Sequence, residues 1–432
     1  MKKRFLMLLT VLLICTGIAA GVWKNRAGSA VPNSPLPNYS AGSPADTSTA
    51  SVSADDENTE LLLTAADFLA DYDRLWKILD ENYFYFPYLE KQGINVESLR
   101  LSTRSQLEER ITDADGFYFL LEFMFRKMQN FAHLDIVTPA GFDIMQKYYN
   151  SDGAPDNGWK TALQDPQAQA FYTHLKKSGE AQSVRNRNQM APARVNASYD
   201  SQLNAAIFKI TSFDDGVMER DRDLIREYLI RLGDVEIDHI IFDISGNEGG
   251  SDLYWQENIV APFGGSWEWT TRCYLRDTEL MRSYFFHDFN PKPVIGISGG
   301  RLPEGVEELC LTHYFDIPRN ISADAMLEGD AHRARRWVVT DGQVYSSADS
   351  FSAFCRETGW ATVIGQTTGG DGKGLSPILV LLPRTGILVR FSGLAAESPD
   401  GELNAIAGTR PDIQTRLSGE DVYELIKRIS EL

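Results

Sequence analysis

The 432-residue sequence is poor in the residues that build metal sites, disulfide frameworks and nucleic-acid surfaces. Its six histidines show neither H-x-x-E-H nor H-x-H spacing, and its four cysteines contain no C-x-x-C pair, so the sequence predicts no metal site. The 42 basic and 60 acidic residues give a net charge of −18, which argues against nucleic acid as a partner because phosphate binding needs a basic face. Beyond Cys15, the cysteines Cys273, Cys310 and Cys355 leave two interpretations open, one disulfide or buried free thiols.

An apolar run stands at the start of the chain. Three basic residues at positions 2–4 precede an apolar stretch over residues 5–23, which is the layout of an export signal and is also long enough for a membrane anchor. As a signal peptide or as a signal-anchor, residues 1–24 predict an extracytoplasmic protein, secreted or anchored to the cell membrane. Residues 25–58 are rich in Ser, Pro, Ala and Thr and nearly free of large apolar groups, which predicts a disordered linker.

A small helical domain is predicted over residues 59–139. Apolar residues recur at helical spacing after Thr64, a suitable N-cap, and again over residues 113–131. Residues 140–200 are more polar and weakly periodic, and we interpret them as a connecting segment with a helix around residues 166–177.

Residues 201–432 are predicted to form an α/β domain. The run AAIFKITSF indicates a strand, GVMERDRDLIREYLIRL an amphipathic helix and DHIIFDISG a buried strand, which together make a βαβ unit with a parallel pair. Further buried strands are predicted at PVIGIS, RRWVVTD and WATVIGQT, the last two separated by the helix-like SADSFSAFCRET. Such alternation is typical of an α/β domain.

Two stretches of this domain carry residues suited to nucleophilic catalysis. In FDISGNEGGSD, a predicted strand leads into Gly249 and Gly250, whose unobstructed backbone N–H groups suit the binding of an oxyanion. The same residues also fit an ordinary tight turn. In VVTDGQVYSSADSFSAF, Ser346 and Ser347 stand where a strand gives way to a helix, and Ser346 with Asp349 also fits an ordinary N-cap. A nucleophile at this place gains from the helix N-terminus, which favours developing negative charge.

A G-x-S-x-G pattern centred on Ser298 competes with these candidates. It follows a predicted strand, as a nucleophile elbow does. That fold requires its acid and then its histidine downstream, but the later histidines are His313 and His332, and the last hundred residues contain none. The pattern is therefore a poor candidate for the nucleophile.

Taken in order, the motifs resemble the tail-specific, or C-terminal-processing, serine peptidase family, to which the tricorn protease core also belongs. The helical region of the family ends near a histidine element, here NFAHLD, and a strand then runs into a glycine-rich turn, here DISGNEGG. A helix next begins at a serine motif, here VYSSAD, and IGQTTGG and GTRPDI complete the order. Each motif is weak alone, but five in the same order over most of residues 60–415 are specific.

The resemblance implies a crotonase- or ClpP-like α/β catalytic core over residues 201–432, preceded by the small helical domain. It implies an exported serine endopeptidase that cleaves unfolded or C-terminal peptide segments through an acyl-enzyme, with no cofactor and with a peptide or unfolded protein as partner. It maps the nucleophile onto Ser346 and the general base onto His133. The oxyanion donors become the amide of Ser347 and an amide at Gly249 or Gly250.

The sequence departs from the family pattern at three positions. The arginine of the glycine-turn motif is Ser245, the acidic residue before the histidine is Phe131, and the glutamate expected before G-x-x-P-D is Ala405. Glu402 lies nearby as a substitute orienting carboxylate, and Lys373 is the alternative base, taken from the family branch that uses a Ser-Lys dyad and usually carries a PDZ module that is not evident here. A histidine without a carboxylate partner keeps less activity, so the alternative function is a weakened or inactive peptidase-fold protein that binds peptides or acts as a scaffold.

Overall fold

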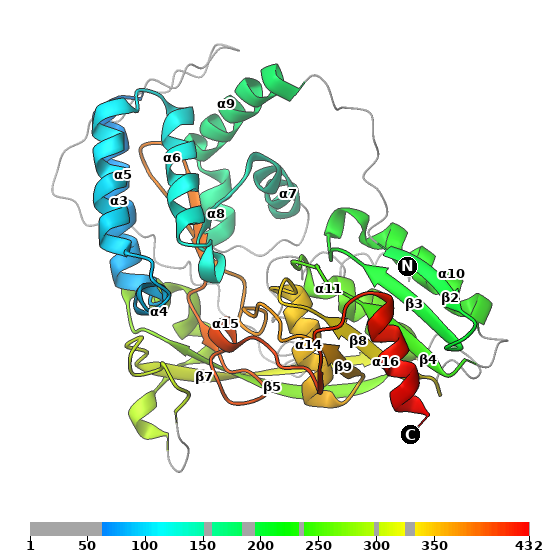
Figure 1. Ribbon diagram of the computed structural model, residues 1–432. Coiled ribbons are helices and arrows are strands. Elements are labelled where there is room, and N and C mark those ends of the chain that lie inside the picture. The colour runs from blue at the N-terminus through cyan, green and yellow to red at the C-terminus, as the bar shows by residue number, and fades with distance from the viewer. Residues whose placement is uncertain are drawn as a thin grey trace, which may run out of the picture.

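The computed structural model has a helical part and an α/β part, seen as the upper left and the lower half of Figure 1. The predicted signal segment and linker lie outside the residues that the structure describes. Within those residues, no helix combines the length and the hydropathy that a membrane span requires. The structure describes residues 63–150, 158–183, 195–232, 237–297, 302–324 and 333–431.

The helical part begins as the sequence predicts. Helix α3 (Ala65–Asn82) starts at Thr64, whose hydroxyl accepts the Asp67 amide while the Asp67 carboxylate accepts the Thr64 amide, a reciprocal capping box. Its apolar face packs with α5 and α6 in one core. The other helices of this part are α4 (Phe86–Lys91), α5 (Val96–Arg110), α6 (Ala114–Lys127), α7 (Pro139–Tyr149), α8 (Gly158–Gln164) and α9 (Pro166–Ser183).

Helices α7 to α9 occupy much of the segment that the sequence suggested was a connector. Thr138 caps α7 by accepting the Gly141 amide, and the helix buries Phe142, Tyr148 and Tyr149. Phe142 stacks on Tyr172 of α9 with ring centroids 4.3 Å apart. A few aromatic side chains therefore join this otherwise polar stretch to the helical core. The mean polarity of the stretch gives no sign of these contacts.

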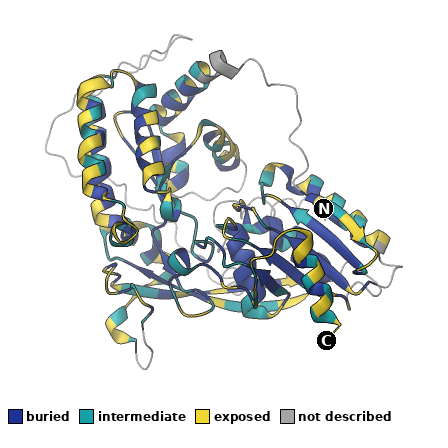
Figure 2. Cartoon of the chain, in the orientation of Figure 1, coloured by how far each residue is buried: buried dark blue, intermediate teal, exposed yellow. Residues whose placement is uncertain are grey.

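Among the described residues, the main sheet has the strand order β13-β9-β8-β4-β3-β2. Its neighbours from β13 to β3 pair in parallel and β2 is antiparallel to β3, so the predicted βαβ unit and the α/β fold are confirmed. The central strands are buried on both faces, as Figure 2 shows in dark blue. The strands are β2 (Val195–Asp200), β3 (Ala205–Ile210), β4 (His239–Asp243), β8 (Arg335–Thr340), β9 (Thr362–Gly365) and β13 (Ile413–Gln414).

Helices cover both faces of this sheet. On one face, α10 (Met218–Leu232) and α14 (Ser347–Thr358) share a core with alternate side chains of the strands. On the other face, α16 (Glu420–Ser430) packs through Val422 and Ile426. Helix α10 connects β3 to β4 and α14 connects β8 to β9, so the carboxyl ends of these parallel strands meet at one edge.

Two antiparallel sheets complete the α/β part. In the described chain, β5 (Gly265–Leu275) and β7 (His313–Ala323) pair over their whole length, with β12 (Ala395–Ala396) beside β5 and β6 (Lys292–Pro293) beside β7. The remaining sheet has the order β1-β11-β10 and joins the end of the helical part to the C-terminal region. Its strands are β1 (Asp135–Ile136), β10 (Ile378–Leu381) and β11 (Leu388–Phe391).

The prediction of a buried strand at PVIGIS is wrong. Val294–Gly296 form a 3-10 turn in which the Ile297 amide donates back to the Val294 carbonyl, so the strand does not continue beyond β6. Ile295 is 95% exposed. Hydropathy alone indicated burial here, but among the described residues only Pro293 of this run pairs with a neighbouring strand, β7.

The cysteines Cys273, Cys310 and Cys355 are all free, the first and last of them buried. The sequence left open one disulfide or buried free thiols. The structure has no disulfide among these three cysteines.

Short connecting helices lie between the strands of the α/β part. After β4 come α11 (Asp252–Trp255), η3 (Gln256–Val260) and η4 (Ala261–Phe263), and η2 (Asp215–Val217) precedes α10. The others are α12 (Glu279–Met281), η5 (Arg282–Phe286), α13 (His287–Phe289) and α15 (Asn404–Ala407).

Candidate active site

Three turns at the carboxyl edge of the main sheet carry most of the candidate residues. We name them the glycine turn (residues 246–250, after β4), the serine turn (residues 341–346, after β8) and the aspartate turn (residues 366–371, after β9). Because β4, β8 and β9 are adjacent and parallel, the turns that follow them lie next to one another.

Backbone hydrogen bonds join the three turns. The Tyr345 amide donates to the Asn247 carbonyl at 3.1 Å, which ties the serine turn to the glycine turn. The Ser346 amide donates to the Gly370 carbonyl at 3.0 Å, which ties it to the aspartate turn. The main chain around Ser346 is therefore fixed from both sides.

Ser346 has a strained backbone and a hydroxyl that does not cap a helix. It occupies the N-cap position of α14 with φ 52° and ψ −127°, and its side chain makes no cap hydrogen bond. A non-glycine residue with positive φ is uncommon and persists only where its surroundings hold it. Its Oγ instead lies 3.0 Å from Nε2 of His133.

His133 reaches the site from the helical part. It ends the 3-10 turn η1 (Phe131–His133), where both Ala132 and His133 have positive φ. Pairing of β1 with β11 brings Ser392 close, and the Ser392 amide donates to the Ala132 carbonyl at 2.8 Å. The His133 side chain is 11% exposed.

The carboxylate beside His133 belongs to Asp371, which the sequence reasoning missed. Oδ2 of Asp371 lies 2.6 Å from Nδ1 of His133, and the Asp371 side chain is 7% exposed. A carboxylate next to Nδ1 places the imidazole proton on that nitrogen, which leaves the Nε2 lone pair free to accept the Ser346 hydroxyl proton. Asp371 also has positive φ, at 57°, so all three members of this triad stand on left-handed backbone.

A signal for Asp371 is present in the sequence. It directly follows the IGQTTGG element, whose last letter is Gly370. A carboxylate that follows the strand next to the one carrying the serine lies at the same edge of a parallel sheet. The motif ends at Gly370, one residue before the acid.

The predicted orienting carboxylate of His133 and the predicted alternative base lie elsewhere. Glu402, the substitute orienter, pairs with Arg410 at 2.6 Å, and Lys373, the alternative base, forms an ion pair with Glu357 and is 4% exposed. Burial raises the pKa of the Glu357 carboxyl, although the Lys373 ammonium opposes the shift. The structure brings neither Glu402 nor Lys373 to the triad.

The predicted oxyanion donors differ in availability. The Gly249 amide donates to Asn247 Oδ1 at 2.8 Å and is therefore occupied. Across the described residues, no acceptor is bonded to the amides of Gly250 and Ser347. A Cβ added to Gly249 would lie 2.9 Å from the Ser346 Cβ, so the glycine turn packs directly against the serine. Of the two glycines, Gly250 is the better donor.

A cation holds the glycine turn even though the motif arginine is Ser245. Lys209 of β3 donates from Nζ to Asp243 Oδ1 at 2.8 Å, to the Ser245 carbonyl at 3.0 Å and to Ser245 Oγ at 2.5 Å. A lysine on the neighbouring strand thus supplies a positive charge at the end of β4.

Asp349 supports the aspartate turn from within α14. Its side chain is fully buried, accepts the Thr368 hydroxyl at 2.5 Å and accepts the Gly372 amide at 3.1 Å. Burial raises the pKa of this carboxyl, and the hydrogen bonds that it accepts oppose the shift. The segment that carries Asp371 is therefore joined to the helix that begins after Ser346.

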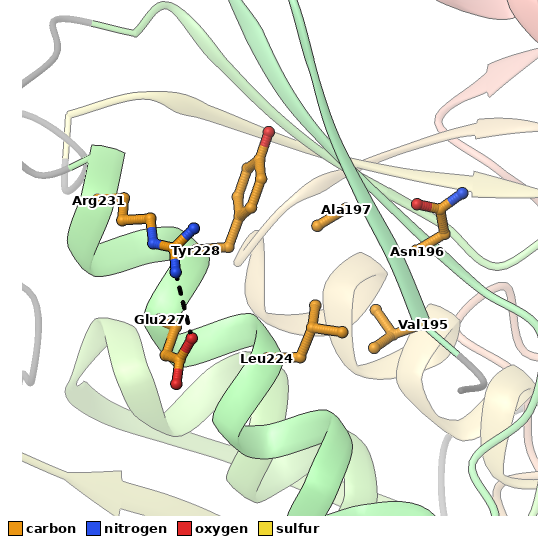
Figure 3. Close-up of a pocket in the computed structure, with 7 residues that line it drawn as sticks. All are labelled: Val195, Asn196, Ala197, Leu224, Glu227, Tyr228 and Arg231. Atoms are coloured by element: carbon orange, nitrogen blue, oxygen red, sulfur yellow. Dashed lines mark hydrogen bonds and ion pairs between the residues drawn. The ribbon is translucent and has the colours of Figure 1, made fainter. Parts of the chain in front are cut away.

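No other part of the described chain gathers comparable chemistry. Ser298 of the competing G-x-S-x-G pattern lies outside the described residues. Within the described ranges, no three His, Cys, Asp or Glu side chains are grouped to hold a metal ion. The pocket in Figure 3 lies between β2 and α10 and includes no residue of the triad.

Residues 204–415 match the model of peptidase family S41. No curated protein matches the sequence. Among solved structures, the chain is similar to a candidate peptidase from Parabacteroides merdae, at 16% identity over 85% of this chain and 96% of that chain, with a TM-score of 0.47. It is similar to mature CPAF at 13% identity over 85% and 95% of the two chains, with a TM-score of 0.47. It is similar to the photosystem II D1 C-terminal processing protease at 13% identity over 82% and 93%, with a TM-score of 0.37.

Proposed function

Because residues 204–415 match the model of peptidase family S41, we propose that the protein is a serine endopeptidase acting on unfolded or C-terminal peptide segments. One observation carries the proposal: Ser346 Oγ lies 3.0 Å from His133 Nε2, and His133 Nδ1 lies 2.6 Å from Asp371 Oδ2. A serine hydroxyl is a weak nucleophile until a base within hydrogen-bond reach removes its proton, and this alignment supplies the base and its orienting carboxylate.

In the proposed reaction, His133 Nε2 takes the hydroxyl proton while Ser346 Oγ attacks the carbonyl carbon of the scissile peptide. The amides of Gly250 and Ser347 stabilise the oxyanion of the tetrahedral intermediate. The imidazolium then protonates the leaving amine, and the peptide C–N bond breaks to give the acyl-enzyme. His133 next removes a proton from water, whose oxygen attacks the ester carbonyl carbon. The ester C–O bond to Ser346 then breaks, the imidazolium returns the proton to Ser346 Oγ, and the carboxylic acid product leaves. Asp371 holds the imidazole tautomer and stabilises the imidazolium.

The proposal places this activity outside the cytoplasm. Its support is the sequence alone, namely the basic positions 2–4 and the apolar residues 5–23, followed by the polar linker. A peptide substrate also agrees with the acidic composition, which disfavours nucleic acid.

The alternative of an inactive scaffold loses most of its motivation. It rested on Ala405, where the family has a carboxylate, on Ser245, where the family has an arginine, and on Phe131, where the family has an acidic residue before the histidine. Asp371 provides a carboxylate on the histidine, and Lys209 provides a cation at the glycine turn. These departures therefore no longer argue for lost catalysis.

A fluorophosphonate probe tests the proposal without knowledge of the substrate. We expect the purified protein to be labelled on Ser346, and Ser346→Ala to lose both the label and the hydrolysis of an unfolded protein such as casein. Ser352→Ala is a matched control in the same helix, since the Ser352 hydroxyl donates only to the Ala348 carbonyl, and it should behave as wild type. Absence of label on the wild type, or label that survives Ser346→Ala, would overturn the assignment.

A further inference from the structure

One oxygen of the triad accepts hydrogen bonds from three side chains. Oδ2 of Asp371 lies 2.6 Å from His133 Nδ1, 2.9 Å from Ser392 Oγ and 3.0 Å from Tyr345 Oη. The donors come from three places: the turn η1, the residue after β11, and the residue before Ser346. This oxygen therefore joins the helical part, the small antiparallel sheet and the serine turn.

The Tyr345 hydroxyl contacts both the base and its carboxylate. Its Oη accepts the backbone N–H of His133 at 3.2 Å and donates to Asp371 at 3.0 Å. Its ring also lies beside the imidazole, with the ring centroids 5.0 Å apart. Burial raises the pKa of the Tyr345 hydroxyl well above its usual range, and the Asp371 charge adds to the shift, so the group remains a donor.

We propose that Tyr345 is a positioning residue of the peptidase, which holds the His133 imidazole between Ser346 and Asp371, and that Ser392 assists it. The role rests on the proposed function because it concerns the same reaction. Its physical reason is the backbone strain of the site: His133 and Asp371 both have positive φ, which persists only when surrounding contacts over-determine it. The Tyr345 hydroxyl bonds to both of these strained residues at once.

The bond to Asp371 has an electrostatic consequence that a merely structural tyrosine would lack. Each donor stabilises the negative charge of the carboxylate, so a carboxylate with three donors attracts the imidazolium less strongly than one with two. Removing the Tyr345 hydroxyl therefore favours the protonated form of His133. The base then becomes active only at higher pH.

Few other charges act on His133 in the described structure. Tyr83 and Tyr85 lie near Asp371, and burial raises the pKa of both hydroxyls well above their usual range, so they stay neutral where a histidine titrates. Asp135 of β1 forms an ion pair with Arg390 of β11 at 2.6 Å, which compensates its charge. The Tyr345 substitution therefore acts on the imidazolium through the Asp371 carboxylate, which loses one of its three donors.

The test is the rate of fluorophosphonate labelling of Ser346 between pH 5 and pH 9. For Tyr345→Phe we expect a plateau rate about 10- to 100-fold below wild type, since a base displaced by a fraction of an ångström loses reactivity. We also expect the midpoint of the acid limb to move up by about half a pH unit. Tyr254→Phe is the matched control, because it removes a tyrosine–aspartate bond of 2.8 Å to buried Asp221 without contact to the triad. It should keep both the rate and the midpoint.

The outcomes separate this inference from the proposed function. Absence of label on wild-type Ser346 would overturn the peptidase assignment itself. Normal labelling of the wild type, together with an unchanged rate and midpoint in folded Tyr345→Phe, would overturn only the role of Tyr345. If circular dichroism finds Tyr345→Phe unfolded, Ser392→Ala decides, because it removes another donor from the same oxygen. The midpoint should again move up, and an unmoved midpoint would contradict the inference.

Discussion

The two sides of the candidate active site are held by different kinds of contact. On the nucleophile side, the amides of Tyr345 and Ser346 bond to carbonyls of the neighbouring turns. On the base side, His133 is held largely by side chains that lie more than two hundred positions away in the sequence, among them Asp371 and Ser392. Main-chain contacts depend on the course of the backbone, whereas side-chain contacts depend on which residue is present.

This difference explains where the sequence keeps the family pattern and where it departs. The serine and glycine motifs, whose backbone forms the contacts, are present in order. The carboxylate is absent at Ala405, and a carboxylate from another turn, Asp371, lies on the histidine instead. A side-chain contact can be supplied from a new position provided that its atoms reach the same place, so the base side can change without loss of geometry.

The largest expected effect comes from breaking the base side at its carboxylate. Asp371→Asn should lower the plateau rate of fluorophosphonate labelling and of peptide hydrolysis by about 10³- to 10⁴-fold. Asparagine keeps the shape of the side chain, but it removes the charge that fixes the proton on Nδ1 of His133. Labelling rates at pH 8, with the fold checked by circular dichroism, measure the effect.

Glu402→Gln is the control for this substitution. Glu402 is the carboxylate that sequence reasoning placed beside His133, and in the structure it pairs with Arg410 instead. Its substitution should leave the labelling rate close to wild type. A loss in Glu402→Gln as large as that in Asp371→Asn would reverse the assignment of the orienting carboxylate.

Breaking the nucleophile side should have the next largest effect. Gly249→Ala places a Cβ 2.8 Å from the Tyr345 carbonyl and 2.9 Å from the Ser346 Cβ, at a φ of +104° that disfavours alanine. Because the turns are joined through the main chain, Ser346 must shift, and we expect labelling to slow by about 10²-fold. The labelling rate and its pH midpoint are the measurements.

Two observations would sharpen or contradict that expectation. The pH midpoint of Gly249→Ala should stay at its wild-type value, because the substitution leaves the bonds of His133 to Asp371 and Tyr345 in place. Gly342→Ala, in the serine turn, adds a Cβ whose nearest neighbour is the Thr367 carbonyl at 3.9 Å, and it should label normally. Equal losses in both alanine variants would mean that the tight contact at Gly249 is not the cause.

Sequence periodicity predicted the parallel core well and the antiparallel sheets poorly. The runs around β3, β4, β8 and β9 are continuously apolar because both faces of the sheet are covered, and such runs are easy to detect. Strand β7 alternates between buried and exposed residues, but charged Arg319 occupies one of the buried positions, so its hydropathy pattern is weak. In PVIGIS, by contrast, hydropathy indicated a buried strand, but strand pairing with β7 ends at Pro293 and the next residues form a 3-10 turn.

In the candidate site, the sequence predicted the residues that belong to recognisable motifs. It did not predict the residues that reach the site through tertiary contacts. Ser346 and His133 were named from the order of the motifs, and the structure places them 3.0 Å apart. Asp371, Tyr345 and Ser392 converge on the histidine only after β1 pairs with β11, a contact that spans more than 250 residues. The place of Asp371 after IGQTTGG is a local signal, but no local pattern encodes the contact of these residues with His133.

The smallest expected effect concerns stability at the nucleophile edge. Asp215 follows β3 in the turn that pairs with Gly250, and burial raises the pKa of its carboxyl to about 6, with the Ser251 hydroxyl opposing the shift and the Asp214 charge adding to it. The folded protein therefore binds this proton more tightly than the unfolded chain, so the contribution of Asp215 to stability falls as pH rises from about 4 through about 6. Asp215→Asn removes the buried charge and should stabilise the fold at pH 7.5 by about 1 kcal/mol, or about 2 °C in Tm. At pH 4.5 the gain should shrink to about a third of this, because the folded-state carboxyl is then mostly protonated.

Asp214→Asn is the control for that measurement. Its side-chain oxygen caps the neighbouring turn by accepting the Gly216 amide at 2.8 Å, and asparagine retains such an oxygen. Because the Asp214 charge is the weakest of the causes that shift the Asp215 pKa, the effect of Asp214→Asn on Tm should differ between the two pH values by less than that of Asp215→Asn. If Asp215→Asn changed Tm equally at pH 4.5 and pH 7.5, the charge of Asp215 would not be what the folded state disfavours. Such a result would mean that the charge of Asp215 does not destabilise the nucleophile side, and that the two sides do not differ in this respect.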